Sequence, residues 1–140
     1  MADRPFISFA QAQAAMQAMI AKANETPDQP VAMCILDDSG NMVAYAHMDN
    51  LRLFSKRHAF RKAYTAAITG MDSVTYGETM HARGLTLPEI SGDPNFTPGQ
   101  GGLAVRSSDG VLMGGIGVGG YPSGVTDEEL ARLGLQAMGL

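Results

Sequence analysis

The residues best suited to chemistry lie in one predicted helix, which covers residues 54–68. Four polar residues recur there at positions i, i+3, i+4 and i+7, which places them on one side of the helix: His58, Arg61, Lys62 and Thr65. Cationic groups this close repel one another unless solvent or an anion lies between them. A carboxylate or phosphate would satisfy them, with Arg61 as a bidentate fork and Lys62 as a point charge. The pattern indicates an anion-binding face, with a solvated face or a subunit interface as the alternative.

The same residues also suit proton transfer. A buried Lys62 would act as a base or as a Schiff-base amine, and His58 is a second general base. A small enzyme of this kind would move a proton next to a carbonyl, as an isomerase, tautomerase or lyase does. Arg61 or Arg52 would then hold the carboxylate of the substrate.

Four further residues complete the predicted site. Asp49 precedes the helix and is expected to orient Lys62 or Arg52 through a charge-assisted hydrogen bond, or else to serve as a turn residue. The backbone amides of Gly101 and Gly102 would bind a carboxylate or an oxyanion, or else serve turn geometry alone. His81 lies near a long Pro- and Gly-containing loop and is a candidate haem ligand or base.

Other motifs argue against several kinds of site. The run from Gly115 to Gly120 satisfies G-x-G-x-x-G, but no strand–helix–strand unit follows it before Leu140. It is therefore interpreted as a glycine-rich strand that a helix or a ligand approaches closely. The three histidines lack tight ligand spacing, so no metal site is predicted. The single cysteine, Cys34, lies in an apolar run and is interpreted as a buried thiol.

Length and composition set broader limits. With 140 residues, 45% of them hydrophobic and 17% charged, the chain is predicted to be one globular domain over residues 1–140. A net charge of −4 argues against nucleic-acid binding, and no apolar run reaches the length of a membrane span. The N-terminus lacks the apolar segment of a secretory signal, so a cytoplasmic location is expected. Ten methionines suit adaptable interfaces, which favours a homo-oligomer.

The pattern of elements predicts an α+β domain. A helix begins after Ser8, with Gln11 completing a capping box, and a hairpin follows over residues 31–48. After the central helix, Asp72 or Ser73 is expected to cap a short helix, and residues 80–96 would form a lid. A second hairpin is predicted over residues 101–119, followed by a last helix that begins at Thr126. Two hairpins imply a mostly antiparallel sheet, flanked by helices.

Four segments, in the right order, resemble the GlcG/HbpS-like family. They are VAMCILDDSGNMVAYAHMDN, SKRHAFRKAYTAAITG, PGQGGLAV and GGIGVGGYPSGVTDEELARLGL. The resemblance covers the chain from about residue 8 to residue 140. It departs from the family pattern at His47, where arginine is common, and at Leu103-Ala104.

The resemblance implies a profilin-like or PAS-like domain, with an antiparallel sheet of about four to five strands flanked by helices. It further implies an oligomeric small-molecule-binding protein that holds haem, another tetrapyrrole or a small anionic metabolite. Some family members are encoded in catabolic operons. A small catabolic enzyme without a cofactor, using the residues named above, is the alternative.

Overall fold

A computed structural model describes residues 4–85 and 92–140. In this part of the chain, four helices and four strands follow one another in the order helix, hairpin, two helices, hairpin, helix. Their bounds are α1 (Phe9–Ala23), β1 (Ala32–Asp37), β2 (Met42–His47), α2 (Leu53–Thr69), α3 (Ser73–Ala82), β3 (Gly102–Arg106), β4 (Leu112–Gly119) and α5 (Gly124–Ala137).

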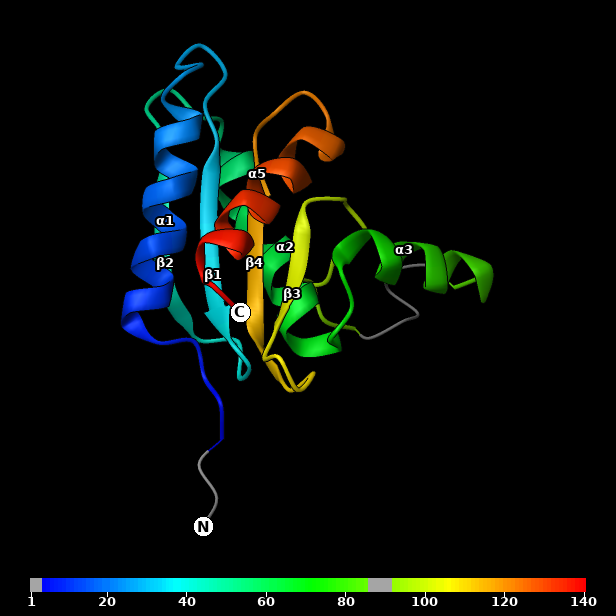
Figure 1. Cartoon of the computed structure of the whole chain (residues 1–140). Helices are drawn as coiled ribbons and strands as arrows, with labels where there is room; N and C mark the ends of the chain where they lie inside the picture. Colours follow the sequence, from blue (N-terminus) through cyan, green and yellow to red (C-terminus); the bar gives the residue numbers. More distant parts are fainter. Residues whose placement is uncertain (1–3, 86–91) are drawn as a thin grey trace.

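The four strands form one antiparallel sheet in the order β2-β1-β4-β3. Helices α1 and α5 pack side by side on one face of the sheet, and α2 covers the other face (Figure 1). The predicted α+β class, with four to five strands flanked by helices, is confirmed. No helix in residues 4–85 and 92–140 is long and apolar enough to cross a membrane.

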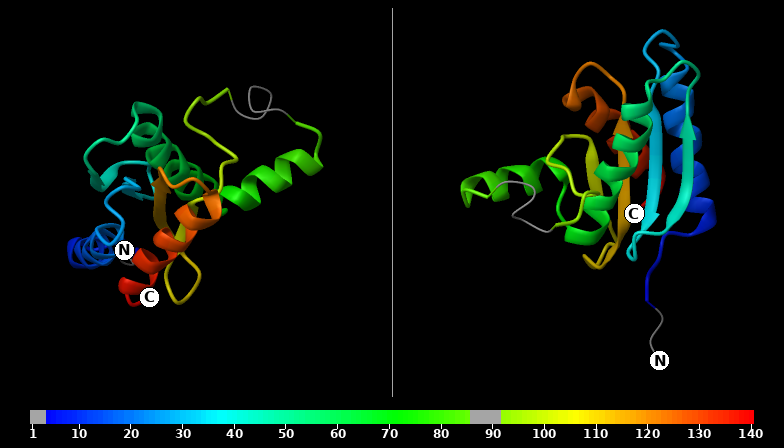
Figure 2. Two further views of the ribbon diagram at one scale, coloured as in Figure 1. Left: turned by 90° about the horizontal axis from the view of Figure 1, so that it is seen from above. Right: turned by 180° about the vertical axis from the view of Figure 1, so that it is seen from behind.

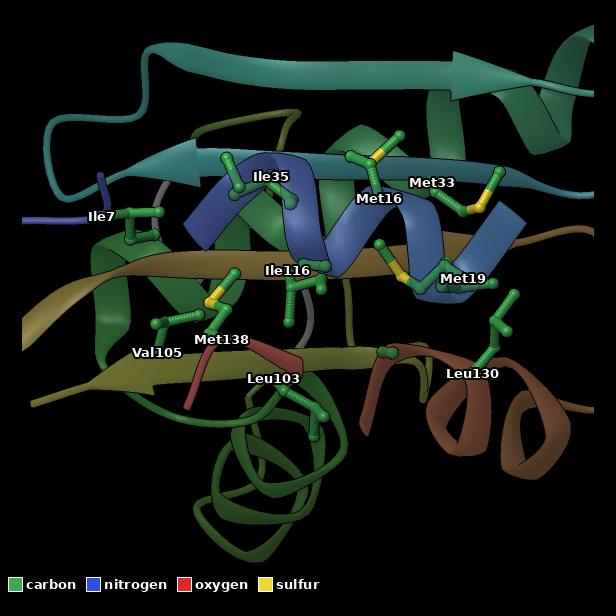
Figure 3. Close-up of a cluster of buried hydrophobic side chains, with 14 of the residues drawn as sticks. Ile7, Met16, Met19, Met33, Ile35, Leu103, Val105, Ile116, Leu130 and Met138 are labelled. Atoms are coloured by element: carbon green, nitrogen blue, oxygen red, sulfur yellow. The ribbon is translucent and has the colours of Figure 1, made fainter. Parts of the chain in front are cut away.

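Strand β1 is apolar from Ala32 to Leu36 because helices cover both of its faces. Met33 and Ile35 point into the larger core beneath α1 and α5, together with Ile116 of β4 (Figure 3). Cys34 and Leu36 point to the opposite side, into the smaller cluster beneath α2. The two alternating apolar sets of a strand therefore stabilise two separate helix–sheet interfaces. Burial also raises the pKa of the Cys34 thiol to about 12, as expected for an unreactive core thiol.

The G-x-G-x-x-G run serves close packing between α2 and β4. A Cβ at Gly115 would overlap the backbone carbonyl of Ala63, and a Cβ at Gly117 would overlap that of Ala59. Alanines on the helix and glycines on the strand thus allow the two backbones to approach closely. The interpretation of the run as a closely approached strand is confirmed, and the approaching element is a helix.

Most predicted helix boundaries agree with the structure. The capping box of α1 is present: the Gln11 N–H donates to the Ser8 hydroxyl at 3.0 Å, and the Ser8 N–H donates to the Gln11 side chain at 3.0 Å. The predicted start of the last helix is wrong. Ser123, not Thr126, is the N-cap of α5, and its hydroxyl accepts a hydrogen bond from the Val125 N–H at 3.1 Å.

Helix α3 extends away from the body of the domain, beyond the β3 edge of the sheet (Figure 2). Its first turn is anchored to that edge strand. Asp72, its N-cap residue, accepts a hydrogen bond from the Ala104 N–H at 3.0 Å, and the Ser73 hydroxyl accepts one from the Gly102 N–H at 2.8 Å. The backbone N–H groups of Gly102 and Ala104, on the outer edge of β3, therefore have hydrogen-bond partners within the chain.

Candidate functional site

The predicted anion-binding side of α2 is only partly open. Lys62 and Thr65 are buried, at 3% and 0% exposure, whereas His58 and Arg61 are half-buried. One flank of the helix lies on the sheet, and the segment that leads into β3 covers another flank. The expectation of a shared open stripe is therefore wrong for Lys62 and Thr65, because helical periodicity does not show which loop returns over a helix.

Lys62 belongs to a buried ion pair at the end of the sheet. Its Nζ donates to Asp127 Oδ2 at 2.7 Å and to the Val118 carbonyl oxygen at 3.0 Å, and both charged side chains are 4% exposed. The other oxygen of Asp127 accepts a hydrogen bond from the Tyr121 N–H at 3.1 Å. The pair thus joins the middle of α2 to the end of β4 and the start of α5.

The position of Asp127 explains how a buried carboxylate is tolerated. Burial raises the pKa of Asp127, and the charge and hydrogen bond of Lys62, with the Tyr121 N–H, partly offset this effect. Asp127 also lies in the first turn of α5, where the helix dipole favours negative charge. The prediction that Asp49 orients Lys62 is wrong, since Asp127 is the carboxylate in contact with it. Asp49 is exposed and lines a different hollow, next to His47 and the end of α1.

Two glycines fit closely around the Lys62–Asp127 pair. Gly101 has a φ of +132°, and a Cβ there would lie 2.8 Å from the Val118 carbonyl oxygen and 2.9 Å from Lys62 Nζ. The Gly102 N–H, expected to be open for an oxyanion, already donates to the Ser73 hydroxyl. The oxyanion role predicted for the Gly102 amide is therefore wrong, and both glycines allow close packing at this junction.

Thr65 holds the segment that returns to β3. Its hydroxyl donates to the Arg61 carbonyl oxygen at 2.8 Å and accepts a hydrogen bond from the Thr97 N–H at 2.9 Å. The Thr97 hydroxyl in turn accepts a hydrogen bond from the Gly99 N–H at 3.2 Å. Thr65 is thus a positioning residue, which fixes residues 97–99 beside His58.

His58 has the chemistry of a neutral ligand-binding imidazole. Its ring stacks on Phe54 at 4.9 Å between centroids, and its Nδ1 is buried without a hydrogen-bond partner among the described residues. Burial, followed by the positive charges of Lys62 and Arg61, lowers the pKa of His58 from 6.5 to about 4. A Cβ at residue 99 would lie 2.8 Å from His58 Nε2, so the backbone of residue 99 lies against this nitrogen and only glycine fits there.

The remaining predicted residues lie apart from this junction. Arg52 is the exposed N-cap residue of α2 and makes no side-chain capping bond. His81 is exposed in the last turn of α3, away from the body of the domain. Part of the predicted lid, residues 86–91, lies outside the described residues, whereas Phe96 packs against the rings of Tyr64 and Tyr76.

Sequence reasoning missed three residues that shape the site: Ser73, Thr97 and Asp127. Asp127 belongs to the Asp-Glu pair of the closing segment that resembles the family. A helix that starts at Thr126 does not indicate that Asp127 lies one turn inside α5. In residues 4–85 and 92–140, no three His, Cys, Asp or Glu side chains gather in a way that could hold a metal ion.

Comparison with solved structures gives the same fold throughout the chain. A double mutant of Streptomyces reticuli HbpS is 28% identical, with a TM-score of 0.86 over 100% of this chain and 92% of that chain. ORFY of Klebsiella pneumoniae is 23% identical, with a TM-score of 0.84 over 99% and 94% of the two chains. A PduOC–haem complex is 24% identical, with a TM-score of 0.82 over 95% of each chain.

Sequence comparison identifies the family. No curated protein is significantly similar to the chain. The family model described as haem-degrading protein HbpS-like matches residues 7–136 of the 140. The predicted GlcG/HbpS-like resemblance is therefore confirmed, and the chain belongs to the HbpS-like family.

Proposed function

We propose that this protein binds haem, or another tetrapyrrole that bears carboxylates, on the outer side of α2. The observation that carries the proposal is His58. Its imidazole is neutral at pH 7, its buried Nδ1 has no partner among the described residues, and residue 99 beside its Nε2 is a glycine, which has no side chain to displace. Neutral imidazole is a common axial ligand of haem iron. Membership of the HbpS-like family and similarity to a protein solved with haem support the same ligand class.

The surroundings of His58 fit the rest of such a ligand. Leu53 and Phe54 are 75% and 62% exposed, which gives an apolar macrocycle a surface to lie on. Arg61, one turn further along α2, is placed to bind a propionate carboxylate. Haem, when bound, would supply an iron centre capable of redox chemistry, while the chain would bind and orient the macrocycle.

The proposal is tested by titrating the purified protein with haemin and following the Soret band. The chain has three histidines, so His47→Ala, His58→Ala and His81→Ala together test each imidazole as a ligand. We expect saturation near one haem per chain. We also expect at least a tenfold loss of affinity and an altered spectrum for His58→Ala only. Unsaturable binding, or a His58→Ala spectrum identical to wild type, would refute the assignment.

A small metabolic enzyme is the second candidate, and the geometry supports it less. Lys62 is enclosed, and its Nζ donates to Asp127 and to the Val118 carbonyl oxygen, so it has no open path to a substrate proton. His58 is the better placed base, with Arg61 on the same helix to hold a carboxylate. Arg52 is less suitable because it is exposed at the helix start.

We also propose that the protein self-associates. Phe6 and Phe9 are 73% and 78% exposed near the start of α1, and a large exposed apolar patch usually marks an interaction surface. Analytical ultracentrifugation of the wild type should show a species larger than 14.7 kDa. The variant Phe6→Ser/Phe9→Ser should reduce its mass. A wild-type monomer at micromolar concentration would contradict the proposal.

A further inference from the structure

A second hollow lies beside the proposed haem site, between β2 and the outer side of α2. Its volume is about 390 Å³, which falls in the lower part of the range of ~300–1,000 Å³ typical of small-molecule pockets. Three cationic side chains line it, together with two aromatic rings and a thioether: Lys56, Arg57, Arg61, Tyr45, Phe60 and Met42. It shares only Arg61 with the residues proposed above to hold haem.

The three cations have no acidic partner within the described part of the chain. The ion pairs formed by residues 4–85 and 92–140 involve other lysines and arginines. Arg57 and Arg61 are also four residues apart on one helix, where like charges repel each other. This concentration of positive charge occurs on a chain with a net charge of −4. An anion in the hollow would relieve the repulsion and supply the missing partner.

The aromatic wall is held in place before any ligand arrives. The Tyr45 hydroxyl donates to the Lys56 carbonyl oxygen at 3.0 Å, which ties the ring of the edge strand to the helix. The Phe60 ring lies 5.7 Å from the ring of Tyr64, measured between centroids. Preformed aromatic surfaces bind flat apolar groups at a low cost in conformational entropy.

From this combination we infer a binding site for an aromatic carboxylate. The carboxylate would bind to Arg57 and Arg61, and the ring would lie between Tyr45 and Phe60 with its edge toward Met42. Asn95, which also lines the hollow, offers a side-chain amide to a polar substituent on the ring. This inference goes beyond the proposed haem binding, because the hollow is small and does not include His58.

The inference is tested by isothermal titration calorimetry, which measures the dissociation constant of 1-naphthoate for the full chain. The titration is done without haemin, at low and fixed ionic strength. The neutral analogue 1-naphthamide and the aliphatic anion acetate separate the contribution of charge from that of the ring. We expect naphthoate to bind at least tenfold more tightly than either analogue. Because haemin is absent, a failed haemin titration leaves this result unaffected.

Two variants localise the site. Arg57→Gln removes an exposed charge without touching the core, and we expect it to weaken naphthoate binding at least tenfold. Arg132→Gln removes a partly exposed arginine of α5, on the opposite face of the sheet, and should leave the affinity unchanged. Equal affinities for naphthoate and naphthamide, equal effects of the two variants, or no naphthoate binding to the wild type would each overturn the inference.

Discussion

Replacing Lys62 with methionine should destabilise the protein by about 3–5 kcal/mol. The change leaves the Asp127 carboxylate buried at 4% exposure, with the Tyr121 N–H as its remaining hydrogen-bond donor. Removing one partner of a buried ion pair typically costs about 3–5 kcal/mol, because the other charge stays desolvated. Asp127→Leu should cost a similar amount, since it leaves the Lys62 ammonium with only the Val118 carbonyl oxygen.

The double variant Lys62→Met/Asp127→Leu should be far less damaging than the sum of the two single changes. It removes both charges and leaves only the Val118 carbonyl and the Tyr121 N–H without side-chain partners, at a cost of about 1–3 kcal/mol each. Apolar replacement of a whole buried pair is often close to neutral in stability. The coupling between the two sites should therefore amount to several kcal/mol.

Urea unfolding followed by circular dichroism measures these free energies. The protein concentration must be fixed, because self-association would add to apparent stability. Lys22→Met is the matched control: Lys22 pairs with Glu25 at 3.4 Å in an exposed position, and its loss should cost under about 1 kcal/mol. A Lys62→Met cost as small as that of the control, or strictly additive single changes, would refute the reasoning.

Lys62→Met should also change how stability depends on pH. Without the ammonium, the pKa of Asp127 in the folded state rises further above its unfolded value, because burial is then opposed only by the Tyr121 N–H. When the folded pKa of a carboxyl lies above its unfolded pKa, the group adds its full contribution to the free energy of unfolding below the unfolded value of 3.8. This contribution is lost as the pH rises through the folded pKa. The gap in stability between wild type and Lys62→Met should therefore narrow on acidification. A gap that widens on acidification would contradict this assignment.

Three further predictions concern positions around the site. Gly101→Ala should lower the free energy of unfolding in urea by at least about 2 kcal/mol, because the new Cβ would meet the Val118 carbonyl oxygen at a φ of +132°. The control Gly110→Ala also has a positive φ but open space around it, and it should cost about 1 kcal/mol. Equal costs for the two variants would contradict the packing argument. Because the pKa of His58 is lowered to about 4 in the folded state, stability should fall as pH drops from 6.5 toward 4. The loss should be about 2 kcal/mol, less than the full pKa shift implies, because His58 is half exposed and solvent screens its charge. His58→Gln should flatten the dependence of stability on pH, and an unchanged slope would assign the effect to other groups. Ser123→Ala should lower the free energy of unfolding by about 1 kcal/mol and Thr126→Ala by clearly less, because Ser123 is the residue that caps α5. A larger loss for Thr126→Ala would indicate that the helix begins at Thr126.

The layers of the fold follow from local signals in the sequence. The spacing of apolar residues after Ser8 and the two hairpins predict the order of helices and strands, because neighbouring residues determine these elements. The glycines of β4 and the alanines of α2 also indicate, by residue type alone, that a helix and a strand approach closely. The error at Thr126 arises because Ser123 and Thr126 both suit an N-cap, and the backbone alone decides between them.

The site is harder to predict because its contacts join residues far apart in sequence. Lys62 and Asp127 are 65 positions apart, and Thr65 and Thr97 are 32 apart. Helical periodicity correctly places His58, Arg61 and Lys62 near one another. It does not show that α5 begins beside Lys62, or that residues 97–99 lie over Thr65. Asp49 is closer in sequence and therefore the more obvious partner for Lys62, yet it does not contact it.

The buried ion pair is better explained by its position than by a gain in stability. Desolvating two charges offsets much of their attraction, so an apolar pair at the same place should cost far less stability than the loss of either partner alone. Yet Lys62 and Asp127 meet where β4 ends and α5 begins, beside the middle of α2, and Gly101 fits against both of them. Gly101 is separated only by Gln100 from the segment, residues 97–99, that Thr65 and Thr97 hold beside His58. The pair therefore fixes one end of that segment and Thr65 fixes the other, so that Gly99 remains opposite His58 Nε2. A double variant that stays fully folded at the assay temperature but binds haemin more weakly would separate this positioning role from a role in stability.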